Sequence, residues 1–379
     1  MLTPEDNAML TRVGPGTPAG EMLRRYWWPV AFSAEVGGRP VSVRLLGQDL
    51  VLFRQQDGGL GLLERYCAHR RASLEYGRVE PTGLRCCYHG WLFARDGRCL
   101  EQPAEPIDST FHTRVKQPAY QAQEVGGLVF GYLGPEPAPL LPRYDLLYRE
   151  DGTRILRGRQ GHCNWLQSAE NAIDMLHLPW LHASVYPDFA GQRAAGEWGR
   201  TPQGLSATLH VPALPAPDVT YLLFPSHNRF AQARVGNEPR QSLIFRVPVD
   251  DTATLHYFVD FMPHPRDAAD QPFVLKTEGM RETAPGAFDW VEDGWWGIPS
   301  ADQDRVVQES QGAIADRSDE HLGASDRGII LFREMVKEAI AAVAAGRDPL
   351  GVIRDPAAHT IVDCDAHSHL IDALPAVRR

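Results

Sequence analysis

The sequence predicts an α+β protein with two domains: a small antiparallel β-domain, and a larger domain in which helices flank one central antiparallel sheet. Three observations support this prediction. Short apolar or alternating segments, such as 41–46 and 50–53, follow one another closely up to about residue 135. A proline-rich stretch at 135–142 then marks a boundary. Beyond residue 150, segments of strand character are mixed with helical ones, which is typical of an α+β domain.

The small domain is expected to cover residues 40–138. Asp96-Gly97 in this region indicates a tight hairpin. Residues 1–39 hold a Gly/Pro loop and then a predicted helix with the aromatic cluster 26–28, and we assign them to the larger domain as its N-terminal segment. The expected strands of the small domain are 41–46, 50–53, 61–66 and 127–133.

The larger domain is expected to cover residues 139–379. Its last predicted helix ends before Gly346 and Pro349, which are typical of a helix C-terminus and its stop. The expected strands are 220–225, 242–247 and 255–259, and the expected helices are 163–178, 302–312 and 326–345.

Composition narrows the class of protein. The chain has 379 residues, 43% of them hydrophobic, which is enough for two cores. The net charge of −10 argues against nucleic acid or an anionic membrane surface as a partner. Six unevenly spaced cysteines do not indicate a disulfide framework. The acidic N-terminus lacks the apolar core of a signal peptide, and no apolar run could span a membrane. A soluble, cytoplasmic protein is expected.

Two short Cys/His loops in the small domain are the strongest functional signal. Cys67-x-His69 is followed, after sixteen residues, by Cys86-x-x-His89. One sulfur and one imidazole from each loop suit a Rieske [2Fe–2S] cluster, in which histidines replace cysteines on one of the two irons. Cys67 and Cys86 would hold one iron, and His69 and His89 the other. Such a centre relays single electrons.

Other uses of these residues explain the pattern less well. Zinc fingers usually open with two cysteines and close with two histidines, which is not the order here. A disulfide between Cys67 and Cys86 would leave the histidines unexplained. Cys87 is an alternative ligand, because Cys87-x-His89 repeats the spacing of the first loop. We prefer Cys86, and expect Cys87 to be a small buried residue.

A second group of possible metal ligands lies in the predicted helix 163–178 and just beyond it. Asp174 and His177 are three residues apart and would share a helix face. His182 is five residues from His177, a rotation of about 140° on a regular helix. Pro179 lies between them and would kink or end the helix, which could bring both imidazoles to one point.

Two histidines and one carboxylate are typical of non-haem Fe(II) oxygenases, because this ligand set leaves positions open for dioxygen and substrate. The third ligand must come from another segment. Residues 300–312 supply three candidates: Asp302, Asp304 and Glu309.

Together these motifs resemble the Rieske non-haem iron oxygenases, and more closely the oxygenase (alpha) components of the phthalate-dioxygenase type. The resemblance covers nearly the whole chain, including Arg25-Tyr26-Trp27 and Asp316-Arg317-Ser318. It implies a helix-grip-like catalytic domain. By motif position, His177 and His182 match the iron histidines. Asp304 best matches the carboxylate ligand, and Asp302 is the alternative.

The resemblance also implies roles for neighbouring residues. Asp174 matches the aspartate that links an iron histidine of one subunit to a Rieske histidine of the next, so a head-to-tail homotrimer is expected. Asn171 matches a position that lines the pocket or supports the metal ligands. A separate reductase carrying flavin would deliver electrons from NAD(P)H. Fe(II) would then use O2 to hydroxylate a small aromatic, carboxylated substrate.

The same machinery also performs O- or N-demethylation of methoxy-aromatic or N-methyl substrates. A Rieske electron carrier without oxygenase chemistry and a zinc-binding structural module are alternatives of other classes. Arg229, Arg234 and Arg246 are candidates for binding an anionic substrate.

Three remaining features have weaker interpretations. The segment 363–369 is rich in Asp and His, and we expect a surface tail or a subunit contact. His162 and Cys163 are expected to be a helix cap or a packing pair. The tryptophans Trp290, Trp295 and Trp296 would belong to the core or to a pocket lid.

Overall fold

A computed structural model describes residues 2–184, 187, 190–214, 216–235, 238–265, 271–282, 300–362 and 364. Its contacts divide the chain into two compact units: residues 24–138, here called the β-unit, and residues 1–23 with 139–379, here called the larger unit. The first division falls after Leu23 and not after residue 39. The reason is that β1 (Trp27–Phe32) pairs with β10 (Leu128–Tyr132) inside the β-unit. The expected helix is present as α2 (Pro18–Leu23), but it ends before the aromatic cluster 26–28, which leads into a buried strand.

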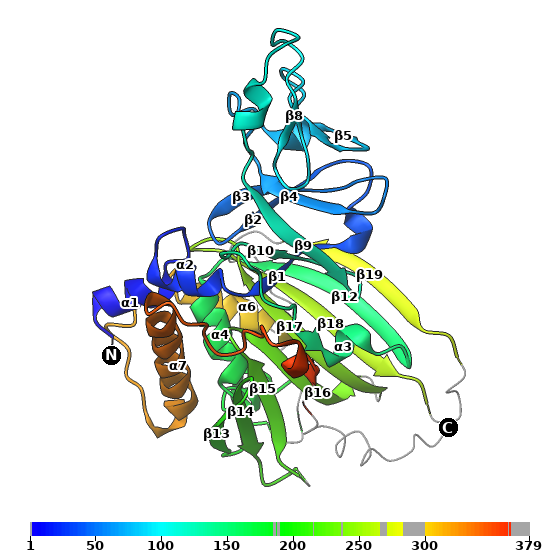
Figure 1. The fold of residues 1–379 in the computed structure, drawn as a ribbon. Coiled ribbons are helices and arrows are strands. Elements are labelled where there is room, and N and C mark those ends of the chain that lie inside the picture. The colour runs from blue at the N-terminus through cyan, green and yellow to red at the C-terminus, as the bar shows by residue number, and fades with distance from the viewer. Residues whose placement is uncertain are drawn as a thin grey trace. The chain divides into compact units, whose positions relative to one another are not determined.

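The β-unit consists of two antiparallel sheets (Figure 1). The first Cys/His loop follows β4 (Leu60–Glu64), and the second joins β6 (Gly83–Arg85) to β7 (Leu92–Phe93). The six-stranded sheet has the order β1, β10, β9 (Ala119–Val125), β4, β3 (Gln48–Arg54) and β2 (Val41–Leu45). The four-stranded sheet has the order β5 (Arg78–Glu80), β6, β7 and β8 (Cys99–Glu101).

The larger unit is built on one eight-stranded sheet, and the predicted α+β class is confirmed (Figure 1). All its strand pairs are antiparallel except β12 with β19, which run parallel. A further short pair, β11 (Arg143–Tyr144) with β20 (Ile361–Val362), is also parallel. The large sheet has the order β13 (Ala195–Thr201), β14 (Gly204–His210), β15 (Asp218–Leu223), β16 (His227–Val235), β17 (Glu238–Pro248), β18 (Thr254–Pro263), β12 (Gly152–Gly161) and β19 (Val274–Arg281).

Two helices, α4 (Trp165–Ile173) and α6 (Ser300–Ser310), cover the face of this sheet on which the second group of possible metal ligands lies. Helix α4 packs on β14, β15 and β17, and α6 lies beside α4. No helix in the described part of the chain is both long and apolar enough to cross a membrane. The other helices are α1 (Pro4–Thr11), α2 (Pro18–Leu23), α3 (Asp145–Tyr148), α5 (Leu178–Leu181) and α7 (Arg327–Ala344).

The helix predicted over 163–178 ends earlier than expected. Helix α4 stops at Ile173, whose carbonyl accepts a hydrogen bond of 2.9 Å from the Trp198 indole. Asp174 already has extended backbone dihedrals, so it does not share a helix face with His177. His177 and His182 instead flank the short helix α5, with Pro179 inside its first turn. The break that brings the imidazoles together therefore lies before Pro179, not at it.

Candidate metal centres

The four predicted cluster ligands lie together at one end of the β-unit's second sheet. Cys67 and Cys86 are buried, and neither forms a disulfide. The rings of His69 and His89 have centroids 4.6 Å apart. Cys87 is exposed, so the expectation that it would be buried is wrong. Its side chain points away from the apolar core of the β-unit, in which Cys67 and Cys86 take part.

Backbone amides next to the two sulfurs favour their thiolate forms. Backbone amides of His69 and Arg70 donate to the Cys67 sulfur, and those of Tyr88 and His89 donate to the Cys86 sulfur. A hydrogen bond from the Cys67 thiol lowers the pKa of Cys86 to about 6 and raises the pKa of Cys67. Hydrogen-bond donors favour the charged form of the group that accepts them. Two adjacent sulfurs held by amide donors therefore fit the sulfur side of a [2Fe–2S] cluster.

The imidazole side of this site is also suited to metal. Partial burial and the neighbouring His89 lower the pKa of His69, which keeps its ring neutral. A neutral imidazole is the form that binds a metal. The indole of Trp91 stacks on His69 with centroids 4.2 Å apart and planes 6° apart. Both histidines are partly exposed.

Gln117 holds the first loop in place, although nothing in the sequence indicated this role. Its side chain is fully buried on the strand side of the loop. The amide nitrogen donates to the carbonyls of Glu64 at 2.7 Å and Tyr66 at 3.1 Å, while its oxygen accepts from the backbone of Ala68 at 2.7 Å. This contact depends on a residue far along the chain, so motif spacing could not reveal it.

The second predicted centre lies in the larger unit. One ligand atom each from His177, His182 and Asp304 can be chosen so that all lie within 4.8 Å of one another. Oδ1 of Asp304 is 3.6 Å from Nε2 of His177 and 3.2 Å from Nε2 of His182. Three ligand atoms this close fit a single metal ion, and a neutral–neutral–anionic set suits Fe(II).

Asp304 is ionised in this surrounding. Burial opposes its ionisation, but a hydrogen bond from His182, the nearby His177 and a hydrogen bond from Asn171 outweigh burial and lower its pKa to about 2. The Asn171 amide donates to Oδ1 of Asp304 at 3.2 Å. Asn171 therefore contacts the carboxylate itself.

Asp174 lies at the other side of His177. Its Oδ2 is 3.8 Å from Nδ1 of His177, which is longer than a hydrogen bond, and its side chain is more than a third exposed. Oδ1 accepts from the backbone amide of Leu176 at 3.0 Å, which fixes the carboxylate at the end of α4.

The other two acidic candidates are engaged elsewhere. Asp302 lies 3.6 Å from arginine nitrogens of Arg159, Arg281 and Arg305. Glu309 pairs with Arg305 at 2.9 Å and accepts from the backbone amide of His162. Neither carboxylate joins the histidines, because Glu309 lies five residues, about one and a half turns, beyond Asp304 on α6, and Asp302 faces the sheet.

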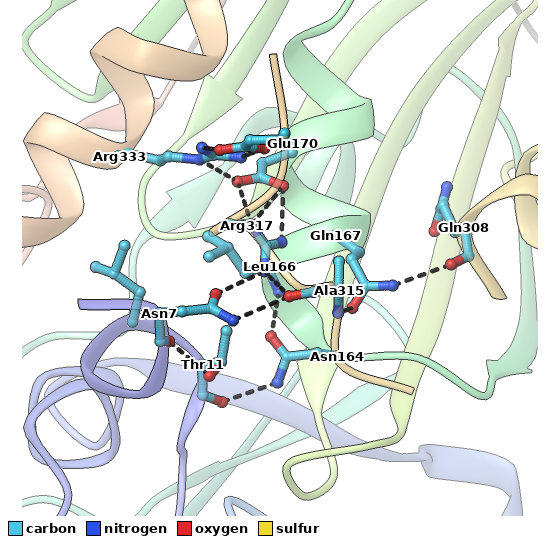
Figure 2. Close-up of polar contacts among 12 residues, drawn as sticks. Asn7, Thr11, Asn164, Leu166, Gln167, Glu170, Gln308, Ala315, Arg317 and Arg333 are labelled. Carbon is cyan, nitrogen blue, oxygen red and sulfur yellow. Dashed lines mark hydrogen bonds and ion pairs between the residues drawn. The ribbon is translucent and has the colours of Figure 1, made fainter. Parts of the chain in front are cut away.

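A polar network ties α4 to the segment that follows α6 (Figure 2). The Gln167 amide donates to the carbonyls of Gln308 at 3.0 Å and Gly312 at 2.9 Å, and accepts from the backbone of Ala315 at 2.9 Å. Asn164 caps the start of α4 by accepting from Leu166. The helix that precedes the histidines is thereby fixed to the helix that carries Asp304.

Glu170 is the charged centre of the same network. Its carboxylate lies between two arginines, with Arg317 at 2.8 Å and Arg333 at 2.6 Å (Figure 2). Arg333 also pairs with Glu320. These residues come from α4, α7 and the segment between α6 and α7, so one largely buried carboxylate joins three separate segments.

The three arginines proposed for an anionic substrate have different surroundings. Arg229 is buried and already paired with Asp145 at 2.7 Å and Gln241 at 2.6 Å. The Arg234 side chain lies outside the described residues. Arg246 is buried, and among the described residues its Nε and Nη1 have no hydrogen-bond partner.

Two of the weaker predictions fall on residues that are not described. The tryptophans Trp290, Trp295 and Trp296, and the segment 363–369 apart from Cys364, lie outside the described residues. Cys163 is buried and its carbonyl accepts from Thr254, in keeping with a packing role.

Comparison with known proteins identifies the relatives of this chain. The family described as Rieske [2Fe-2S] domain matches residues 26–116, and LigXa C-terminal domain like matches residues 286–367. The 5,5'-dehydrodivanillate O-demethylase oxygenase subunit of a Sphingobium species is 35% identical, over 94% of this chain and 85% of the relative. The phthalate 4,5-dioxygenase oxygenase subunit of Pseudomonas putida is 35% identical, over 93% of this chain and 89% of the relative. NdmA of Pseudomonas putida CBB5, solved with caffeine, shares the fold: its TM-score is 0.68 at 20% identity, over 89% of this chain and 99% of that chain.

A Rieske domain joined to a sheet domain with two histidines and a carboxylate defines an iron-dependent oxygenase component. The chain belongs to the Rieske non-haem iron oxygenases, and the resemblance seen in its motifs is confirmed. It accordingly uses a Rieske [2Fe–2S] cluster and a mononuclear iron, and it receives electrons from a separate reductase or ferredoxin.

Proposed function

We propose that this chain is a terminal oxygenase in which His177, His182 and Asp304 hold the mononuclear iron. Cys67, Cys86, His69 and His89 hold the cluster. The observation that carries the proposal is the convergence of two imidazole nitrogens and one carboxylate oxygen within 4.8 Å. When bound, the iron activates dioxygen and the cluster supplies it with single electrons.

The side chains around the iron position already hold the Asp304 ligand in place for metal binding. Asp304 supplies the anionic ligand, and Asn171 holds its Oδ1 from the α4 side. Gln167 fixes α6 against α4, and Glu170 of α4 holds the segment that follows α6 through Arg317, so the carboxylate stays opposite the histidines. A ligand set of only three protein atoms leaves room for dioxygen and substrate.

We further propose that Asp174 passes electrons to His177 from the cluster of a neighbouring subunit. Asp174 faces Nδ1 of His177 and is exposed enough to meet a second chain. The partly exposed His69 and His89 are the complementary surface of that neighbour. A head-to-tail homotrimer satisfies both contacts in every subunit, because heterologous contacts related by a threefold axis close into a ring.

The substrate class follows from Arg246. Nε and Nη1 of this buried guanidinium have no hydrogen-bond partner among the described residues, which is costly, and a bound anion would offset that cost. Arg246, His256 and Arg159 form one row across β17, β18 and β12. Their face is covered by α4 and α6, since Ser168 contacts His256 at 2.6 Å and Asp302 contacts Arg159. Arg246 therefore lies under the helices that border the iron position, and we propose a small aromatic carboxylate as substrate.

The reaction we favour is hydroxylation, with O- or N-demethylation as the second candidate. The two relatives named above differ in this respect, one being an O-demethylase subunit and the other a dioxygenase subunit. Both reactions begin with the same ligands, and the position of the substrate carbon selects between them. The cytoplasm, where reduced nicotinamide is available, stays the predicted compartment.

Iron counting on anaerobically prepared protein tests this proposal. The oxygenase requires the two irons of the cluster and one more, whereas an electron carrier would bind only the two. Asp304→Ala should lose the additional iron and keep the EPR signal of the reduced cluster. Asp302→Ala is the matched control and should keep all the iron. A wild-type protein that holds only cluster iron would contradict the proposal.

A further inference from the structure

Gln303 makes a contact with an iron-site histidine that the motif does not include. The residue is fully buried on α6, immediately before Asp304. Its side-chain oxygen lies 2.8 Å from Nδ1 of His182, which is itself buried. Neighbouring residues of one helix therefore contact both nitrogens of the same ring, since Oδ1 of Asp304 lies 3.2 Å from Nε2.

This contact decides which nitrogen of His182 can bind a metal. An amide oxygen only accepts hydrogen bonds, so Nδ1 of His182 carries the proton and donates it. With Nδ1 occupied, Nε2 is the nitrogen that a metal would bind, in place of the hydrogen bond that Nε2 makes with Asp304. In metal sites, the partner of the distal ring nitrogen fixes the tautomer and the ring orientation of the ligand.

His177 has no comparable support. Its Nδ1 is buried and has no hydrogen-bond partner among the described residues. The nearest carboxylate, Asp174, lies 3.8 Å away. Of the two imidazoles, only that of His182 is thus fixed in orientation by a short hydrogen bond to α6.

The position of Gln303 is itself well determined by the fold. Gln167 of α4 binds the carbonyl of Gln308 near the C-terminal end of α6 and that of Gly312 just beyond it. Because α6 carries Gln303 and Asp304 together, the orienting group and the anionic ligand move as one body.

We propose that Gln303 is a positioning residue that orients His182 and presents its Nε2 to the iron. This inference rests on the proposed function only in requiring a metal at the His177, His182 and Asp304 site. It predicts that the acceptor atom at residue 303, and not the volume of the side chain, sets how tightly that metal is held.

Two substitutions separate this role from simple packing. Gln303→Leu keeps the volume and removes the acceptor, so iron should be lost to a ferrous chelator roughly 10- to 100-fold faster under anaerobic conditions. Gln303→Glu keeps an acceptor at Nδ1 and should hold iron within a few-fold of wild type. A packing role gives the opposite order, because Leu suits a buried position and Glu would bury a charge. Gln311→Leu, on the exposed side just beyond α6, is the matched control.

Proton NMR of the cobalt(II)-loaded wild type provides a readout that does not depend on the folding of a variant. One paramagnetically shifted imidazole N–H should exchange slowly with water, because the His182 Nδ1 proton is buried and bonded. Absence of that resonance, or equal iron retention by wild type and Gln303→Leu, would overturn the proposal. A wild type that binds no metal at this site would instead refute the proposed function.

Discussion

The carboxylate of Asp174 faces Nδ1 of His177 at 3.8 Å, on the ring nitrogen opposite to the one that faces Asp304. One imidazole thus separates an exposed carboxylate from the proposed iron position. This arrangement suits the proposed transfer of electrons from outside the unit, through Asp174 and His177, to the iron. Asp174 would then serve electron transfer, whereas Asp304 would bind the iron.

Asp174→Asn should therefore leave both metal centres occupied and nearly abolish turnover. The amide keeps the shape of the side chain but carries no charge with which to hold a protonated or metal-bound partner imidazole. Iron content, the reduced-cluster EPR signal and single-turnover oxidation of the cluster by O2 are the measurements. Glu197→Gln, which also alters an exposed carboxylate in the larger unit, serves as the control. Retention of fast cluster oxidation in Asp174→Asn would rule out the bridge.

Cys86→Ser and Cys87→Ser should behave in opposite ways. Cys86 is buried beside Cys67 and receives backbone hydrogen bonds, whereas Cys87 is exposed. Loss of the Cys86 thiolate should remove the cluster and its visible absorption, and Cys87→Ser should keep the spectrum of the wild type. The reverse result would shift the second loop by one residue and assign the sulfur ligand to Cys87.

The Cys/His loops could be recognised from sequence because ligand chemistry constrains spacing within a few residues. The same reasoning reached the two histidines but left Asp302, Asp304 and Glu309 open, since a helix presents several carboxylates and only packing decides which one faces inward. The family resemblance favoured Asp304, and the structure brings that residue to the histidines.

What the sequence could not predict depends on contacts between distant segments. The early end of α4 involves the Trp198 indole, and the first loop depends on Gln117. The hydrogen bond between Gln303 and His182 joins residues 121 positions apart. No periodicity or motif encodes such pairs, because each requires the packed core to exist first.

Glu170→Gln should destabilise the protein by about 3 kcal/mol at neutral pH, the low end for breaking a buried ion pair, because Arg333 keeps Glu320 as a partner. Burial opposes ionisation of Glu170, but Arg317 and Arg333 outweigh it and hold its pKa below the ordinary value of 4.5. The stabilisation is therefore fully present above pH 4.5 and is lost as the pH falls through the lower folded-state pKa.

Urea denaturation of wild type and Glu170→Gln at a series of pH values measures this effect. The difference between the two proteins should stay constant from neutral pH down to about 5 and narrow below 4.5. Glu338→Gln, which breaks an exposed pair with Arg200, should cost less than about 1 kcal/mol. A difference that instead widens in acid would show that Glu170 is protonated in the native state.

Arg246→Gln should reduce affinity for aromatic carboxylates and leave the stability of the protein unchanged or higher. Burial lowers the pKa of Arg246 to about 10, so the group stays charged at neutral pH without a bonded counter-charge at Nε and Nη1 in the described structure. Replacing a buried charge whose Nε and Nη1 lack hydrogen-bond partners removes its desolvation cost. A carboxylate bound by this guanidinium should lose roughly ten- to a hundredfold in affinity, as expected for a charged hydrogen bond of about 1.5–3 kcal/mol.

Calorimetric titration of anaerobic, iron-loaded protein with benzoate, phthalate and 3-phenoxybenzoate, each against its carboxamide, measures this discrimination. Wild type should prefer the carboxylates, and Arg246→Gln should bind acid and amide alike. Arg200→Gln, at an exposed ion pair on β13, should retain the preference. If wild type binds none of the acids more tightly than its amide, Arg246 does not recognise a carboxylate and the substrate is a neutral compound.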